Sequence, residues 1–257
     1  MKAKVLSVYD EGAKEGTPLI GSRGLAMIAD VDGERTLFDT GLRGKYLMHN
    51  LENLGVEPDS VDRIVISHMH KGHTGGLETF LESRNEKTDV IMPPHPHTET
   101  GPLRFVRNAG MPKMSDEAQA KMNLITVNEW TQLSNSLFIT GNIVNEGLVG
   151  NVNENALILM TKNGSAAICG CCHNGVSSLI SYVEERTNKK VSAIIGGLHL
   201  NKMRRKDVHA VAETLTERGT PSLYLNHCTG YNQKMHLRER LGLKGVNDFY
   251  VGTEIHF

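Results

Sequence analysis

A strand-like segment that runs directly into three closely spaced histidines is the feature that most restricts how this chain can fold. Residues Arg63–Ser67 are rich in apolar and β-branched side chains, the sequence HMHKGHTGG follows over 68–76, and helical periodicity begins at Leu77. Side chains two apart on an extended segment point to the same side, so His68 and His70 can face one ion. His73, at the turn into the helix, can come back toward it. Neutral imidazoles suit zinc, iron, nickel or copper better than magnesium or calcium, so the motif predicts a transition-metal site at a strand end.

The overall charge excludes some classes of partner. Lys and Arg total 28 against 29 for Asp and Glu, and the formal net charge is −1. No global field would therefore draw the chain to nucleic acid or to an anionic membrane, and we expect a small-molecule substrate. The oligomeric state is left open, and a homo-oligomer is allowed.

The terminus and the cysteines predict a cytoplasmic address. The first residues, MKAKVLSVYDEG, have no apolar core of a secretion signal, and no run of about 18 apolar residues offers a membrane span. Cys169, Cys171, Cys172 and Cys228 are too crowded for a secreted disulfide framework. We therefore expect reduced thiols that are either buried or bound to metal.

Strand-like and helix-like segments alternate along the chain. Hairpin turns are predicted at Asp32-Gly33 and Asn163-Gly164, and the mixture of hairpins and strand–helix alternation predicts an α/β (α+β) fold with four layers, αββα. Residues 1–257 are expected to form one domain, with a proline-containing, loop-rich insertion or lid at about 93–155. The predicted strands are Lys4–Tyr9, Ala26–Val31, Arg35–Phe38, Arg63–Ser67, Asp89–Met92, Ala156–Met160, Ala166–Cys169, Ala193–Ile195 and Leu223–Leu225, and the predicted helices are Tyr46–Leu54, Leu77–Ser83, Asp116–Met122, Val176–Thr187 and Asp207–Arg218.

Three later segments carry further candidate ligands, in the sequences GCCHNG (170–175), GGLHL (196–200) and HCTG (227–230). His173 and His227 each follow an apolar strand, so both are predicted metal ligands, although a helix-start residue is the alternative for His173. His199 could ligate metal, bind substrate or orient another ligand, and a loop histidine without a role in the site is the alternative. Cys171 and Cys228 could ligate as thiolates, whereas packing as small apolar side chains is the alternative for both.

These motifs together resemble the metallo-β-lactamase superfamily, with FDTG at 38–41 as the strand-end Asp motif and SHMHKGHTGG at 67–76 as the H-x-H-x-D-H motif. Within it, the later motifs are similar to the branch related to 7,8-dihydropterin-6-methyl-4-(β-D-ribofuranosyl)aminobenzene-5′-phosphate synthase, which shows G-C-S-H, G-G-F-H-L and H-C-T-G patterns. The resemblance implies an αββα fold and a metal site. It also implies that Asp39 lies beneath the metal loop and orients it.

The chain departs from the superfamily pattern at Gly72, where the family places an Asp that helps to hold a second metal with His73 and the last motif histidine. Glycine has no ligand atom. A first site built from His68, His70 and His173 would keep an open position for water. The second site is left with His73 and His227, and Cys171 stands where many members have a bridging Asp. The sequence therefore predicts one or two ions, with zinc favoured and iron or manganese allowed.

Metal-bound water is the predicted nucleophile, because an ion with an open position makes hydroxide available near neutral pH. We therefore expect a metallo-hydrolase of the zinc type, or a transferase, acting on a small anionic metabolite of phosphorylated or pterin-like character. Lys202, Arg204 and Arg205, with His199, are the predicted substrate-binding residues, although a solvated helix start is the alternative for the cations. An iron-dependent redox protein and a degenerate, non-catalytic binding protein are the other hypotheses.

Overall fold

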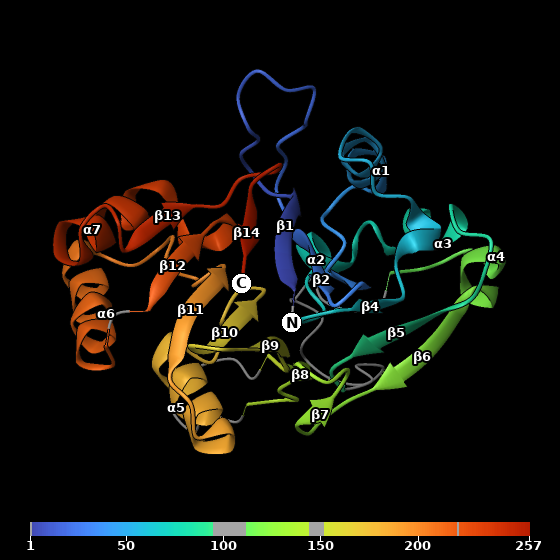
Figure 1. Ribbon diagram of the computed structural model, residues 1–257. Helices are drawn as coiled ribbons and strands as arrows, with labels where there is room; N and C mark the ends of the chain where they lie inside the picture. The colour runs from blue at the N-terminus through green and yellow to red at the C-terminus, as the bar shows by residue number, and fades with distance from the viewer. Residues whose placement is uncertain (1, 95–111, 144–151, 220) are drawn as a thin grey trace, which may run out of the picture. The chain divides into compact units, whose positions relative to one another are not determined.

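Two units, each built on its own seven-stranded mixed sheet, make up the chain (Figure 1). The structure is a computed structural model that describes residues 2–94, 112–143, 152–219 and 221–257. The N-terminal unit comprises Lys2–Asn128 and Tyr250–His256, and the C-terminal unit comprises Glu129–Phe249. The predicted α/β class is confirmed, whereas the prediction of a single domain over 1–257 stays a prediction.

The sheet of the N-terminal unit is antiparallel on one side and parallel on the other. From β14 to β3 neighbouring strands run antiparallel, and from β3 to β6 they run parallel. In spatial order the strands are β14 (Glu254–His256), β1 (Ala3–Tyr9), β2 (Ala26–Val31), β3 (Glu34–Phe38), β4 (Arg63–Val65), β5 (Thr88–Met92) and β6 (Met122–Thr126).

Short helices cover this sheet with apolar side chains. Leu47 and Leu51 of α1 and Phe80 of α3 are fully buried, in one cluster with strand residues such as Val8 and Ile64. Each such side chain contributes about 1.5–3 kcal/mol when it leaves water. The helices are α1 (Gly44–Asn53), α2 (Lys71–Thr74), α3 (Leu77–Glu82) and α4 (Asp116–Ala120), with a 3-10 turn at Pro58–Ser60.

The C-terminal unit repeats this plan with longer helices. Strands β10 to β13 run parallel to one another, and β7 to β10 run antiparallel. The strand order is β13 (Val246–Asp248), β12 (Ser222–Leu225), β11 (Val191–Gly196), β10 (Gly164–Cys169), β9 (Ala156–Thr161), β8 (Leu137–Ile139) and β7 (Thr131–Gln132). Helices α5 (Val176–Thr187), α6 (Arg205–Glu217) and α7 (Tyr231–Leu241) share one hydrophobic core with it.

Strand register explains why the motifs gather at particular edges. In the N-terminal unit Phe38 of β3 pairs with Val65 of β4, so the segments that follow these two parallel strands begin side by side. In the C-terminal unit Cys169 pairs with Gly196, and Gly196 with Leu225. The loops that carry the later motifs therefore leave the sheet at one edge, the carboxyl end of parallel strands, where ligands commonly bind in such sheets.

Several boundaries differ from the sequence prediction. The predicted helix Asp116–Met122 was too long, because α4 ends at Ala120 and Met122 begins β6. The turn predicted at Asn163-Gly164 lies one residue earlier, since Gly164 already pairs with Thr161 in the hairpin. The Asp32-Gly33 turn is confirmed, with φ values of 53° and 93°.

The predicted lid at 93–155 is only partly described. Its described residues contain α4, β6, β7 and β8, so they supply an edge strand to each sheet. The remainder lies outside the described residues, and its role as a lid stays a prediction.

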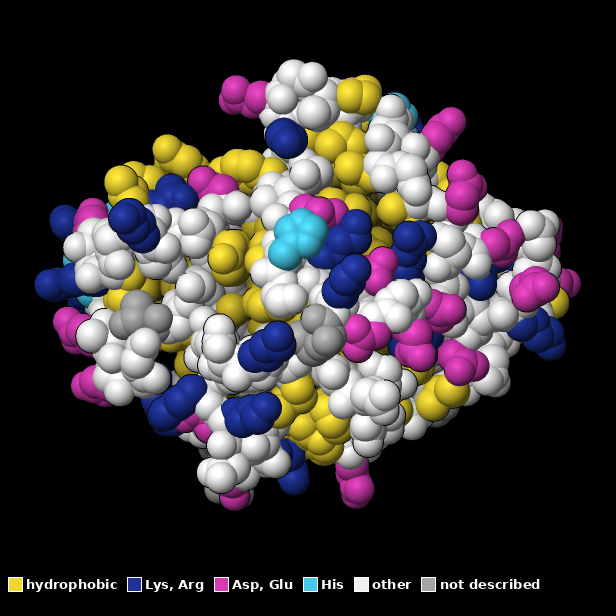
Figure 2. Space-filling view, in the orientation of Figure 1, with side chains coloured by type: hydrophobic (Ala, Val, Ile, Leu, Met, Phe, Trp, Pro, Cys, Tyr) yellow, Lys and Arg dark blue, Asp and Glu magenta, His cyan; other side chains and the backbone are white. Residues whose placement is uncertain are grey.

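Two observations on the described residues agree with the composition. Lysine and arginine side chains are interspersed with aspartate and glutamate on the face shown in Figure 2, which accords with the formal net charge of −1. Among the described residues, no helix has the length and apolar character that crossing a membrane requires.

Candidate functional site

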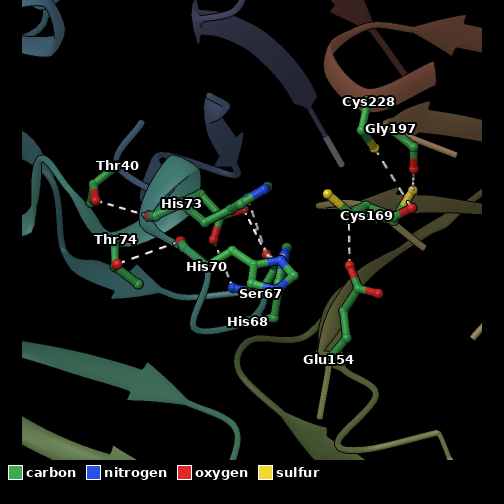
Figure 3. Close-up of polar contacts among 12 residues, drawn as sticks. Thr40, Ser67, His68, His70, His73, Thr74, Glu154, Cys169, Gly197 and Cys228 are labelled. Atoms are coloured by element: carbon green, nitrogen blue, oxygen red, sulfur yellow. Dashed lines mark hydrogen bonds and ion pairs between the residues drawn. The ribbon is translucent and has the colours of Figure 1, made fainter. Parts of the chain in front are cut away.

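The predicted histidine motif forms a buried cluster in the N-terminal unit (Figure 3). His68 and His73 are 0% and 1% exposed, and their ring centroids lie 4.1 Å apart. His68 Nε2 and His70 Nδ1 face each other at 2.9 Å. At this distance one nitrogen donates its proton to the other, or both bind a common cation. The donor set of this cluster therefore suits a divalent transition-metal ion.

Asp39 organises the cluster from the end of the neighbouring strand. Its Oδ1 accepts the backbone N–H of Ser67 at 2.7 Å, and its Oδ2 accepts the Ser67 hydroxyl at 2.7 Å. Oδ2 also lies 2.6 Å from His73 Nδ1. Asp39 is fully buried and adopts a left-handed φ of 61°, a backbone conformation that is uncommon outside glycine.

These hydrogen bonds assign the histidine tautomers. A carboxylate only accepts, so His73 carries its proton on Nδ1. The Ser67 hydroxyl gives its proton to Asp39 and therefore accepts from His68 Nδ1, which lies 2.9 Å away. Both imidazoles then present the lone pair of Nε2, the atom that can bind a metal.

Backbone contacts fix the loop that carries the histidines. The backbone N–H and the hydroxyl of Thr40 both donate to the carbonyl of His73, at 2.8 and 2.9 Å. The carbonyl of Gly72 accepts from Leu25 N at 3.0 Å. A side chain at Gly24 would meet that carbonyl at 2.6 Å, so residue 24 must be glycine for the loop to pass so close.

The C-terminal unit brings together a second set of predicted residues at the edge where β10, β11 and β12 end. The ligand atoms of Cys171, His199 and Cys228 all lie within 4.8 Å of one another. The rings of His173 and His199 pack with centroids 4.4 Å apart. The backbone N–H of His199 points at Cys228 Sγ, 3.2 Å away. Two thiols and an imidazole so arranged are a donor set typical of zinc or iron sites.

Electrostatics in this set favour a thiolate. Burial alone would raise the pKa of Cys228, but hydrogen bonds from the Cys171 and His199 side chains hold it well below its usual value. The same bond to Cys228 raises the pKa of His199. Cys169 differs, because a hydrogen bond with Cys172 and its own burial raise its pKa. Cys169 thus packs as a neutral core residue, which agrees with the expectation of reduced thiols that are either buried or bound to metal.

The loops after β10, β11 and β12 each contain a residue in a strained, left-handed backbone conformation. Cys172, His199 and His227 have left-handed φ values of 56°, 52° and 45°. Such residues cost of order 1–3 kcal/mol each and persist where surrounding contacts determine them. The strand-end loops of this unit are therefore held in specific conformations by their neighbours.

Glu154 is a buried carboxylate in this unit that the sequence motifs did not indicate. It accepts the backbone N–H groups of Cys171, Cys172 and His173, at 2.7, 3.0 and 2.5 Å. Burial raises its pKa to about 7, although the backbone hydrogen bonds act in the opposite direction. None of the sequence motifs contains Glu154. Its position, just before the strand that pairs with β10, is the feature by which it could have been identified.

The predicted substrate-binding cations lie at the start of α6. Arg204 pairs with Asp207 at 3.0 Å, and Arg205 pairs with Glu239 at 2.9 Å. Lys202 is exposed in the preceding turn. Two of these three cations are thus engaged by carboxylates of the same chain, and a substrate contact for any of them stays a prediction.

Comparison with known proteins identifies the fold family. The family model described as the Metallo-beta-lactamase superfamily matches residues 21–142, which include Asp39 and the histidine cluster. The chain is thus similar to this superfamily over residues 21–142 and shares its fold. The predicted resemblance and the αββα fold class of metallo-β-lactamases are thereby confirmed.

Several known proteins resemble this chain over nearly its whole length. The 7,8-dihydropterin-6-methyl-4-(beta-D-ribofuranosyl)-aminobenzene-5'-phosphate synthase of Methanocaldococcus jannaschii is 24% identical, over 89% of this chain and 88% of its own. A crystal structure of a metal-dependent hydrolase of the beta-lactamase superfamily has a TM-score of 0.78 and 22% identity, covering 98% of each chain. The metallo-beta-lactamase fold protein YhfI from Bacillus subtilis has a TM-score of 0.66 and 12% identity, covering 100% of each chain.

The predicted site residues fall into two groups in the described structure. Asp39, His68, His70 and His73 lie together in the N-terminal unit. Cys171, His173, His199, His227 and Cys228 belong to the C-terminal unit. The prediction that His173, His227 and Cys171 complete the metal site stays a prediction.

Proposed function

We propose that the chain is a metal-dependent hydrolase or transferase that acts on a small anionic metabolite. The observation that supports this most directly is the buried histidine cluster, in which Ser67 and Asp39 present Nε2 of His68 and His73 as lone-pair donors. Such orienting partners are a regular feature of metal-binding histidines. A purely structural cluster would not require this tautomer on both rings.

The proposed ligands follow from the donor atoms. His68, His70 and His73 would bind the ion from the N-terminal unit, and we propose His173, His227 and Cys171 as its other ligands. A divalent ion held by such residues activates water for attack near neutral pH. Asp39 and Ser67 keep the imidazole rings in the ligating tautomer, so the chain's own contribution is to prepare the ligands before the ion arrives.

The proposed substrate class is anionic, and phosphorylated or pterin-like. The relative from Methanocaldococcus jannaschii is named as a synthase of a dihydropterin-derived phosphate, which supports this class without identifying the substrate. Lys202 is the cation on which the proposal relies most, because Arg204 and Arg205 already pair with Asp207 and Glu239. We expect Lys202→Ala to raise KM for a phosphorylated substrate more than it lowers kcat.

Metal content tests the proposal. The protein is purified without chelator or added metal, and bound ions are measured by mass spectrometry for wild type, His68→Ala, His173→Ala, His227→Ala and Cys171→Ala. We expect at least one ion per chain in wild type and a loss of metal in His68→Ala. His49→Ala is the control, because His49 is a partly exposed histidine of α1 whose ring contacts the carbonyl of Pro18. Wild type that holds no ion, even after refilling with zinc, manganese or iron, would refute the proposal.

Iron-dependent redox chemistry is a second candidate, favoured by the two thiols grouped with His199. Iron as the native metal, with a visible thiolate charge-transfer band that disappears in Cys171→Ala, would support it. Zinc with no such band in the iron-loaded protein would exclude it.

A degenerate, non-catalytic protein is the third candidate, and Gly72 is its basis. Gly72→Asp supplies the carboxylate that the superfamily motif normally has. A large gain in metal-dependent turnover in this variant would show that the natural site is impaired, whereas unchanged turnover would show that Gly72 suits the natural reaction. Hydrolysis of phosphate mono- and diesters, with and without added metal, is the assay.

A further inference from the structure

Glu154 supports the loop that carries two proposed ligands. We propose that its buried carboxylate is a positioning residue, which holds Cys171 and His173 in the geometry that binds metal by accepting the N–H groups of three successive residues. This inference rests on the proposed function. It assigns a role to a residue that none of the sequence motifs contains.

The strand register brings Glu154 to this loop. Strands β9 and β10 pair antiparallel, with Cys169 opposite Ala156. If the same register continued beyond the strands, residue 154 would stand opposite residue 171. The backbone ladder ends there, and the Glu154 side chain takes the place of a β-strand partner by accepting the backbone N–H of Cys171. Figure 3 shows the carboxylate directed at this loop.

The backbone shape of the loop explains why a carboxylate fits. Cys172 has a left-handed φ of 56° between neighbours of ordinary φ. A left-handed residue in such a position turns successive N–H groups toward one point and makes a small concavity that binds anions. Here the chain's own Glu154 fills that concavity. Oε1 accepts from Cys171 and Cys172, and Oε2 accepts from His173.

Glu154 holds the backbone N–H groups of this loop, whereas other hydrogen bonds hold its carbonyl groups. The carbonyl of Gly170 accepts from Gly197 N at 3.2 Å, and the carbonyl of Cys172 accepts from Gly175 N at 2.9 Å. These bonds hold the carbonyls, and Glu154 holds the N–H groups. Without the carboxylate, three buried donors would have to turn away, and the side chains of Cys171 and His173 would turn with them.

The test combines amide exchange with metal affinity. Glu154→Ala removes both acceptor oxygens, and Glu154→Gln keeps Oε1 but replaces Oε2 by an amide that cannot accept from His173. In Glu154→Gln we therefore expect faster hydrogen exchange at the amide of His173 and near wild-type exchange at Cys171 and Cys172. We expect zinc affinity, measured by competition with a chelator, to fall about 10- to 100-fold in Glu154→Ala and by less in Glu154→Gln.

The control is Glu184, whose Oε1 accepts the backbone N–H of Val191 at 3.3 Å in the same unit but away from these loops. Glu184→Gln should leave zinc affinity unchanged. A second control is Cys172→Gly combined with Glu154→Ala, because glycine adopts positive φ without strain. If Glu154 acts by holding the loop shape, this double variant should recover part of the lost zinc affinity.

Each result has a definite meaning. Wild-type zinc affinity in Glu154→Ala would overturn the inference while leaving the proposed function intact. If Glu154→Ala does not fold, Glu154→Gln decides, and unchanged affinity together with unchanged exchange at His173 would overturn the inference. Wild-type protein that binds no metal would refute the proposed function instead. In that case, amide exchange that is slow in wild type and faster in the Glu154 variants would still show the contact between Glu154 and the loop.

Discussion

Asp39→Asn tests whether one carboxylate sets the state of the histidine cluster. Asparagine tolerates the left-handed φ of 61° at this position, so the backbone can stay in place. If the asparagine oxygen keeps its bond to Ser67 N, the amide N–H₂ stands where Oδ2 contacted Ser67 Oγ and His73 Nδ1, at 2.7 and 2.6 Å. The amide then donates to both of these atoms.

Two histidine tautomers should change as a result. His73 must accept at Nδ1 and so carries its proton on Nε2. The Ser67 hydroxyl now accepts from the asparagine and donates to His68 Nδ1, which moves the His68 proton to Nε2 as well. Both ligating lone pairs are lost together. If the amide flips instead, its N–H₂ faces the buried N–H of Ser67 and leaves that donor unsatisfied.

The magnitudes follow from these contacts. Loss of the charge-assisted bonds in a fully buried place should lower the free energy of unfolding of the metal-free protein by about 1.5–3 kcal/mol. Zinc affinity should fall about 10- to 100-fold, since orienting partners of metal-binding histidines have effects of that size. That range corresponds to about 1.4–2.8 kcal/mol of binding free energy.

Urea unfolding and zinc competition measure the two effects separately. Asp62→Asn is the matched control, because exposed Asp62 also accepts a backbone N–H in this unit, that of Arg35 at 2.7 Å. It should change stability by less than about 0.5 kcal/mol. Unaltered zinc affinity in Asp39→Asn, or a stability change no larger than that of the control, would refute the tautomer argument.

Three other measurements test separate parts of the structure. The pKa of Glu239 is lowered from 4.5 to about 2 by a hydrogen bond from a histidine of α6, so its stabilisation is present above pH 4.5 and lost as pH falls toward 2. Glu239→Gln should reduce the change in the free energy of unfolding between pH 2 and pH 4.5. It should leave the pH dependence of that free energy unchanged at pH 7 to 8. Gly197→Ala should cost about 1–3 kcal/mol in urea unfolding, since its Cβ would lie 2.5 Å from Cys228 Sγ and 2.6 Å from the Gly170 carbonyl; a loss too small to measure would contradict that packing. Chelation should lower the thermal midpoint of wild type and leave that of His68→Ala unchanged.

Local patterns predicted the elements whose contacts are mostly local. The boundaries of β2 and α5 match the predicted segments, because strand-like composition and helical spacing were uninterrupted there. Histidines that directly follow apolar strands could also be singled out from the local pattern, because strand ends commonly carry binding residues. The metal-site candidates His68, His173 and His227 were identified in this way.

Elements that depend on distant partners were not predictable from local patterns. Strand β14 pairs with β1, with His256 opposite Lys4 at the other end of the chain. Helix α7 carries few apolar residues and buries only Lys234 and Leu237 among its described positions, so its periodicity was too weak to recognise. The buried Lys234 is explained by Asp248 of β13, which lies 2.5 Å away, a pairing that no local pattern contains.

The two units use the same device to hold the loops that carry the proposed ligands, and this device explains why the sequence indicated those residues more readily than their supports. In the N-terminal unit Asp39, at the end of β3, accepts the backbone N–H of Ser67 after neighbouring β4. In the C-terminal unit Glu154, just before β9, accepts backbone N–H groups after neighbouring β10. Each carboxylate lies across from the loop that it orders, so only strand pairing brings them together. Once the strand register is known, Asp39 and Glu154 can both be recognised as acidic residues opposite strand ends that carry proposed ligands.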